Sequence, residues 1–145
     1  MDELERMLAR EACRELVLQA ALHVDANRPE QFAALFAEDG VLTRPNAQPL
    51  RGREAILAAY RQRPADRITR HLVTNTLVTL ESDTEARAAS YVLLWSGSAD
   101  AEPGAQGRPA HPRRMVGEFD DRFVLTAEGW RIARREARFV LHLEA

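Results

Sequence analysis

Proton transfer by histidine and carboxylate side chains is the chemistry that the residue types of this sequence favour. The 145-residue chain contains four histidines and 22 aspartates and glutamates, and its 20 lysine-plus-arginine positions are all arginine. Without lysine, a lysine Schiff base, a lysine general base and the lysine of a phosphate-binding P-loop are excluded. Histidine titrates near neutral pH and can take up and return a proton, so it is the first candidate for an acid–base group.

Cysteine and metal chemistry are not indicated. The single cysteine, Cys13, cannot form an internal disulfide, and no Cys/His spacing matches a zinc site. We expect Cys13 to be a small, buried helix residue. The sequence therefore predicts neither a metal nor a cofactor.

The spacing of the other histidines gives them no partner. His23 lies two residues before Asp25, which places the two side chains about 200° apart around a helix. His111 falls in a loop segment and His142 lies near the C-terminus. We assign these three histidines no chemical role.

Size and charge bound the class of protein. A mass of 16.3 kDa fits one domain, residues 1–145, with a core of its own. The formal net charge of -2 argues against nucleic acid or an anionic membrane as partner. The N-terminus is charged throughout, and no stretch reaches the ~18 apolar residues of a membrane span. We expect a soluble, cytoplasmic protein.

Three helices are predicted in the first half of the chain. The first covers residues 2–26, the second begins at Pro29 and is closed by residues 38–40, and the third runs from Glu54 to about Arg63. The first helix rests on residues at three-four spacing: Leu4, Met7, Leu8, Glu11, Ala12, Glu15, Leu18 and Leu22.

From residue 69 the pattern becomes extended and predicts four long antiparallel strands, after a brief strand at 41–43. Residues 96–113, rich in proline and glycine, predict an irregular loop or lid. The four strands are 69–80, 85–95, 115–125 and 130–143.

This order predicts an α+β domain whose helices cover one face of the sheet. Strand 69–80 has apolar residues on both of its faces. We therefore expect the sheet face that the helices do not cover to pack on a further partner, such as a second subunit. In the last strand the apolar parity changes, which predicts a bulge or bend near residues 134–136 and a bent sheet that can enclose a pocket.

Four segments carry a family resemblance: NRPEQFAALFAEDGV, LRGREAILAAY, TRHLVTN and EGWRIARREARF. Together with the order of elements they resemble the nuclear transport factor 2-like superfamily, and within it the SnoaL-like proteins. The resemblance implies a cone in which helices and a curved sheet enclose a mostly apolar pocket, and a homodimer through the sheet. Members include ketosteroid isomerases, scytalone and bile-acid dehydratases, limonene epoxide hydrolases, polyketide cyclases and non-catalytic binding domains.

The same resemblance implies a catalytic pair. Asp25 in AALHVDANRPEQF and His71 in TRHLVTN match positions at which the dehydratase-like members carry a pocket aspartate and a pocket histidine. A buried carboxylate can fix the histidine tautomer and stabilise the imidazolium. Those dehydratases commonly carry a tyrosine on the first helix, which this chain lacks, and the oxyanion donors of a ketosteroid isomerase cannot be assigned.

Tyr60, Asn75 and Trp95 are candidate substrate-binding residues. Tyr60 on the third helix would polarise a carbonyl, or be a core residue. Asn75 shares the strand parity of His71 and would supply an amide to the pocket, or make a cross-strand or turn hydrogen bond. Trp95 would line the cavity, or belong to the core or an interface.

The arginines have alternative interpretations. Arg134 and Arg138 share a parity, and Arg138 would bind a substrate carboxylate. Ion pairs with the acidic residues of the neighbouring strand, Glu118, Asp120 and Asp121, are the simpler expectation. The run of Arg61, Arg63, Arg67 and Arg70 is typical of a solvated face.

The leading hypothesis is a cofactor-independent lyase or isomerase of the dehydratase type that acts on a small, apolar, carbonyl-bearing metabolite. His71 would move the proton and Asp25 would orient it, while Tyr60 or Asn75 would stabilise enolate charge. The alternatives are a non-catalytic module that binds a small molecule or a partner, and a polyketide cyclase. A structure in which Asp25 and His71 do not meet in a closed cavity would favour the binding module.

Overall fold

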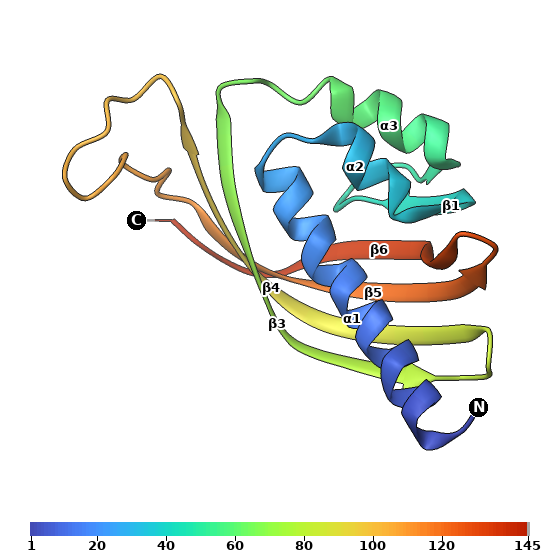
Figure 1. Cartoon of the computed structure of the whole chain (residues 1–145). Helices are drawn as coiled ribbons and strands as arrows, with labels where there is room; N and C mark the ends of the chain where they lie inside the picture. Colours follow the sequence, from blue (N-terminus) through green and yellow to red (C-terminus); the bar gives the residue numbers. More distant parts are fainter. Residues whose placement is uncertain (145) are drawn as a thin grey trace.

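The order of elements follows the change from helical to extended periodicity at residue 69, two residues after the start of the third strand. In the computed structural model, which describes residues 1–144, the helices lie in the first half of the chain and the four long strands in the second (Figure 1). In chain order the elements are α1 (Glu3–Asp25), α2 (Pro29–Ala34), β1 (Phe36–Thr43), β2 (Leu50–Arg51), α3 (Arg53–Arg61), β3 (Arg67–Leu80), β4 (Glu85–Ser98), β5 (Arg114–Thr126) and β6 (Gly129–Leu143).

Helix α1 has a defined cap at each end. The Asp2 side chain accepts a hydrogen bond from the Glu5 backbone N–H at 2.8 Å, and the Glu5 side chain accepts one from the Asp2 N–H at 2.8 Å. This capping box satisfies donors that the first turn leaves free. The helix ends at Asp25 because Asn27 adopts a left-handed conformation with a φ of 54° and a proline follows.

The residues whose spacing predicts α1 do not form its buried face. Leu4, Leu8 and Leu22 are 63%, 61% and 65% exposed. The side chains that pack on the sheet are mostly small, and small side chains let the helix axis approach the sheet closely. They are Ala9, Cys13, Leu16, Val17 and Ala20. Cys13 is buried, as predicted.

The prediction that the second helix continues to residues 38–40 is wrong. Helix α2 ends at Ala34, and the chain enters β1 at Phe36. Phe36 pairs with Ile132 of β6, and the Ile132 backbone N–H donates to the Leu35 carbonyl at 2.8 Å. Pairing with a strand almost a hundred residues away outweighs the local helical pattern.

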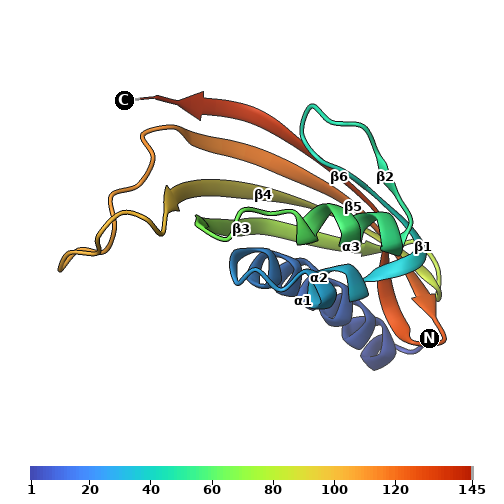
Figure 2. The same ribbon diagram turned by 90° about the horizontal axis from the view of Figure 1, so that it is seen from above.

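The sheet has six strands in the order β2-β1-β6-β5-β4-β3. The four long strands are antiparallel neighbours, as predicted. Strand β1, however, pairs with β6 in parallel, so the sheet is mixed. Figures 1 and 2 show the three helices on the concave side of the curved, open sheet. The predicted α+β cone is confirmed.

Within residues 1–144, the sheet contains four register shifts, and two of them bear on the sequence predictions for β6 and β3. Phe123 of β5 pairs with Ile132 of β6, and its neighbour Arg122 pairs with Arg134. Strand β6 therefore has a bulge between Ile132 and Arg134, next to the bulge predicted near residues 134–136. In β3 the register shifts between Thr74 and Leu77. Bulges of this kind displace every later side chain to the other face.

The loop predicted at 96–113 begins at residue 99, because β4 continues to Ser98. It projects beyond the end of the sheet (Figure 1), and none of residues 99–113 lines the cavity described below. Within residues 1–144, no helix combines the length and apolar character needed to cross a membrane.

Candidate active site

Asp25 and His71, 46 positions apart in the sequence, are in direct contact. Oδ1 of Asp25 lies 2.6 Å from Nδ1 of His71. Oδ2 of Asp25 accepts a hydrogen bond from the His71 backbone N–H at 2.9 Å. The two side chains are only 11% and 19% exposed, so the contact is largely shielded from water and from screening by salt.

The topology explains how the two residues meet. Asp25 is the last residue of α1, and His71 lies on β3, the edge strand of the sheet. An edge strand has backbone N–H groups without a strand partner, and one of them binds the carboxylate. A carboxylate at the C-terminus of a helix lies at the unfavourable end of the helix dipole, so Asp25 depends on these hydrogen bonds.

Thr69 completes the support of the carboxylate. Its side chain is fully buried, and its hydroxyl donates to Oδ1 of Asp25 at 2.7 Å. The same hydroxyl oxygen accepts a hydrogen bond from Nη2 of Arg63 at 2.6 Å. Arg63, Thr69, Asp25 and His71 therefore form one continuous hydrogen-bond network.

The network determines the protonation of the pair. Burial alone raises the pKa of Asp25, but hydrogen bonds from the His71 ring, the His71 backbone and Thr69 together lower it below its ordinary value. An ionised carboxylate only accepts hydrogen bonds, so Nδ1 of His71 must carry the hydrogen. In the neutral imidazole, Nε2 then has the free lone pair and can act as a base.

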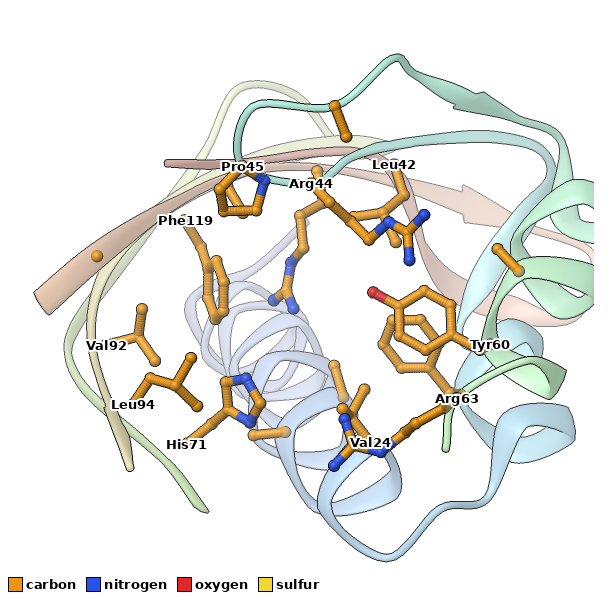
Figure 3. A pocket seen from close by; sticks show the side chains of 18 of the residues that line it. Val24, Leu42, Arg44, Pro45, Tyr60, Arg63, His71, Val92, Leu94 and Phe119 are labelled. Atoms are coloured by element: carbon orange, nitrogen blue, oxygen red, sulfur yellow. The ribbon is translucent and has the colours of Figure 1, made fainter. Parts of the chain in front are cut away.

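The His71 ring faces a cavity of about 610 Å³ between the helices and the concave face of the sheet. In Figure 3, His71 and Tyr60 project into it from opposite sides. Much of the lining is apolar, with contributions from Val24, Leu42, Val92, Leu94, Met115 and Phe119. The site is thus a concave, partly apolar pocket with a few polar groups, as is usual for small-molecule sites.

Tyr60 is placed as a hydrogen-bond donor. Its ring stacks on Phe32 at a centroid distance of 4.4 Å, and its hydroxyl makes no hydrogen bond with any residue of 1–144. Burial raises the pKa of Tyr60, although nearby arginine charges oppose this. The hydroxyl therefore stays protonated at neutral pH and can donate to a ligand oxygen in the cavity.

This arrangement suits proton transfer. It supplies a base whose lone pair faces the cavity, a carboxylate that orients the base and a protonated hydroxyl. Within residues 1–144, no group of three or more His, Cys, Asp or Glu side chains is placed to hold a metal ion.

Sequence comparison places the chain in a family. The SnoaL-like domain matches residues 5–136, a range that includes both Asp25 and His71. The chain belongs to the SnoaL-like domain family. No curated protein sequence matches it.

Several solved structures have the same fold as this SnoaL-like domain. A proposed scytalone dehydratase from Novosphingobium aromaticivorans is 25% identical, with a TM-score of 0.80 over 97% of this chain and 90% of the other. A hexachlorocyclohexane dehydrochlorinase from Novosphingobium barchaimii is 16% identical, with a TM-score of 0.83 over 99% and 94%. ActVI-ORFA from Streptomyces coelicolor is 22% identical, with a TM-score of 0.70 over 88% and 93%. At their lower identities, the second and third structures show the fold alone.

Asn75 and Trp95 do not line the cavity of this SnoaL-like domain. The expectation that Asn75 faces the same side as His71 is wrong, because Asn75 has a φ of 55° within the β3 bulge and is exposed. Trp95 lies on the outer face of β4 at 42% exposure, with the Arg114 guanidinium 5.0 Å from its ring centre. The bulge reverses the parity on which the Asn75 assignment depends.

Arg138 borders the cavity, but its guanidinium is bound elsewhere. It lies 2.8 Å from a Glu118 oxygen and 2.7 Å from an Asp120 oxygen. The predicted cross-strand ion pairing of Arg138 is therefore confirmed. Arg134 instead pairs with Glu136 on its own strand.

Several arginines that line the cavity were not predicted from the sequence to do so. Arg63 and Arg67 line the cavity, as does Arg44. The prediction of a solvated arginine face is wrong only for Arg63, which is half-buried, whereas Arg67 is exposed. All three lie outside the long helices and strands or at an end of one, where periodicity carries no information about facing.

Arg135 is a further residue that only the register reveals. It forms two hydrogen bonds with buried Asp121, at 2.7 and 3.0 Å, and its guanidinium lies 4.1 Å from the Phe119 ring centre. Arg135 and Asp121 are 4% and 2% exposed. Arg135 lines the cavity, with Asp121 behind it, and removing either partner would leave a buried charge uncompensated.

Proposed function

We propose that this SnoaL-like domain is a cofactor-independent lyase or isomerase of the dehydratase type, acting on a small, largely apolar molecule that contains a carbonyl group. One observation carries the proposal: Nδ1 of His71 lies 2.6 Å from Asp25, and the His71 ring faces the cavity. That geometry leaves Nε2 as a positioned base.

The first step is abstraction of a proton from the carbon next to the carbonyl. Nε2 of His71 takes the proton, and the electrons of the C–H bond move into an enolate. Asp25 stabilises the imidazolium that forms. The Tyr60 hydroxyl, which projects into the cavity (Figure 3), donates a hydrogen bond to the enolate oxygen.

The second step returns the proton. When the substrate has a hydroxyl on the β carbon, the imidazolium protonates it, water leaves, and the enolate electrons form the new double bond. When the substrate instead has a carbon–carbon double bond conjugated with the enolate, the imidazolium protonates the far carbon of the dienolate, the double bond shifts, and an isomer forms. The names of two structural neighbours, a dehydratase and a dehydrochlorinase, both describe eliminations, which supports the first of these outcomes.

Exchange of hydrogen for deuterium tests the proton transfer without knowledge of the natural substrate. The purified protein is incubated in deuterium oxide with a panel of cyclic ketones, with and without a β-hydroxyl group and with and without a ring carboxylate. NMR follows the α protons and any eliminated product. We expect wild-type protein to accelerate exchange or elimination. The rate with His71→Ala should be lower by a factor of about 10²–10⁴.

A histidine outside the site provides the control. His142 is exposed and does not line the cavity, so His142→Ala should retain the wild-type rate. Circular dichroism and thermal melting test whether the His71→Ala variant is folded. Wild-type protein that accelerates no reaction in the panel, or a folded His71→Ala variant with the wild-type rate, would contradict the proposal and favour a non-catalytic binding module.

A further inference from the structure

The charged residues that line the cavity are all arginines. No aspartate or glutamate of residues 1–144 lines it. The five arginines are Arg44, Arg63, Arg67, Arg135 and Arg138. A largely apolar molecule with one carbonyl group does not require such a lining, so the arginines call for a separate explanation.

Two of the five have carboxylate partners of their own. Arg135 is paired with buried Asp121 through two hydrogen bonds. Arg138 is paired with Glu118 and Asp120 on the outer face of the sheet. Their positive charges are therefore already balanced within the fold.

The other three, Arg44, Arg63 and Arg67, form what we call the arginine cluster. None of them has an ion pair within 4.0 Å in residues 1–144. Arg63 donates one hydrogen bond to Thr69, and its buried Nε has no partner. Arg63 is half-buried, whereas Arg44 and Arg67 are exposed at the cavity rim. A partly buried guanidinium without an anionic partner, such as that of Arg63, is unfavourable because burial removes water that would solvate the charge.

The arginine cluster lines the cavity near Tyr60, whose pKa all three positive charges act to lower. The guanidinium carbon of Arg44 lies 5.6 Å from the Tyr60 ring centre. Burial lowers the pKa of Arg63 and the positive charge of Arg67 lowers it further, although the negative charge of Asp25 opposes this in part. Like charges that line the same cavity repel each other, and an anion bound among them would relieve the repulsion.

We propose that the substrate carries a carboxylate, which the arginine cluster binds beside Tyr60. The apolar body of the molecule packs on the opposite side of the cavity, where Val92 and Leu94 lie across from Tyr60 and Arg63 (Figure 3). Guanidinium groups bind carboxylates through paired hydrogen bonds of matching geometry. The role of this ligand as substrate rests on the proposed function, whereas its recognition does not.

A matched pair of probes isolates the charge. Naphthoate and naphthamide have the same apolar body, and only naphthoate is an anion. Isothermal titration calorimetry should show that wild-type protein binds naphthoate at least about tenfold more tightly than naphthamide. Charge-assisted hydrogen bonds are stronger than neutral ones, and the difference in strength corresponds to about that ratio of binding constants. Arg44→Gln combined with Arg67→Gln should remove this preference and leave naphthamide binding unchanged.

The control variant is Arg61→Gln. Arg61 lies two residues before Arg63 but does not line the cavity and pairs with Glu30 at 3.1 Å, so the preference should persist. Arg44 and Arg67 donate no side-chain hydrogen bond within residues 1–144, and their replacement should leave the melting temperature unchanged. Equal binding of the two probes, binding of neither, or a preference that survives the double substitution would overturn the inference.

Inorganic phosphate and proton exchange complete the test. Displacement of naphthoate by phosphate at an equal concentration would overturn the carboxylate class in favour of a phosphate. Wild-type protein that prefers naphthoate but accelerates no exchange in the ketone panel would contradict the proposed function and leave carboxylate binding intact. Protein that accelerates exchange without preferring naphthoate would contradict carboxylate binding and leave the proposed function intact.

Discussion

At the scale of single residues, Asp25 connects the fold to the chemistry. Its two oxygens accept three hydrogen bonds, from the His71 ring, the His71 backbone and Thr69. The same bonds that hold α1 against β3 also select the tautomer of His71. Positioning and stability are therefore supplied by the same atoms, and a change at Asp25 should affect both.

Replacement of Asp25 by asparagine should destabilise the protein in a pH-dependent manner. The pKa of Asp25 lies below its ordinary value of 3.8, so folding favours the ionised form. Its stabilising contribution is complete above that ordinary value and is lost as the pH falls through the lowered pKa. Loss of buried hydrogen bonds to a charged group predicts a deficit of about 1–3 kcal/mol near neutral pH.

Urea unfolding of wild-type and Asp25→Asn protein between about pH 5 and pH 2 measures this difference. The gap in unfolding free energy should narrow as the pH decreases. A gap that is constant, or that widens toward acid, would show that the carboxylate charge does not contribute. Asp100→Asn, in the loop outside the cavity, provides a control without the buried network.

At the scale of elements, close backbone approach between strands shapes the cavity wall. Gly117 of β5 lines the cavity, and a Cβ at this position would lie 2.8 Å from the Arg138 carbonyl oxygen and 3.2 Å from a Val92 methyl carbon. Backbone atoms of a paired strand cannot move aside cheaply. The strand pair therefore depends on a residue without a side chain at this point.

Gly117→Ala should destabilise the protein by about 1–3 kcal/mol, because the added methyl group forces β5 and β6 apart. Gly104→Ala is the matched control, since a Cβ there meets nothing closer than 3.9 Å. Chemical unfolding of both variants measures the difference. Equal stability of the two would mean that the sheet relaxes around the methyl group without cost.

At the scale of the whole molecule, the cone leaves the convex face of the sheet uncovered. The helices occupy the concave side (Figure 2). On the outer face, Leu72 pairs across strands with Leu93, and the two are 51% and 40% exposed. Tyr91 and Trp95 flank Leu93 on the same face of β4. We propose that a second copy of the chain covers this surface, as the family resemblance implies.

Leu93→Arg should convert the dimer into a monomer, because it places a charge at the centre of the apolar surface. Leu18→Arg is the control, since Leu18 is 46% exposed on α1 and away from the sheet face. Sedimentation equilibrium should give twice the chain mass for wild-type and Leu18→Arg protein. A wild-type monomer, or a dimeric Leu93→Arg variant, would contradict a dimer through the sheet.

The sequence alone was sufficient for features that depend on local energetics or on residue inventory. Periodicity and turn residues located α1, α3 and the four long strands to within a few residues, and the absence of lysine left histidine and carboxylate as the main candidates for proton transfer. The family segments pointed to Asp25 and His71, and the fold brings these into contact.

Only the tertiary structure decided features that depend on a distant partner. Pairing with β6 turned residues after Ala34 into a strand, and the β3 bulge moved Asn75 to the outer face. Whether an arginine is neutralised also depends on strand register: Arg135 meets Asp121, whereas Arg63 meets no carboxylate. Local pattern records the preferences of neighbouring residues, but strand pairing and charge balance join residues far apart in the chain, so the lining of the cavity follows from the fold.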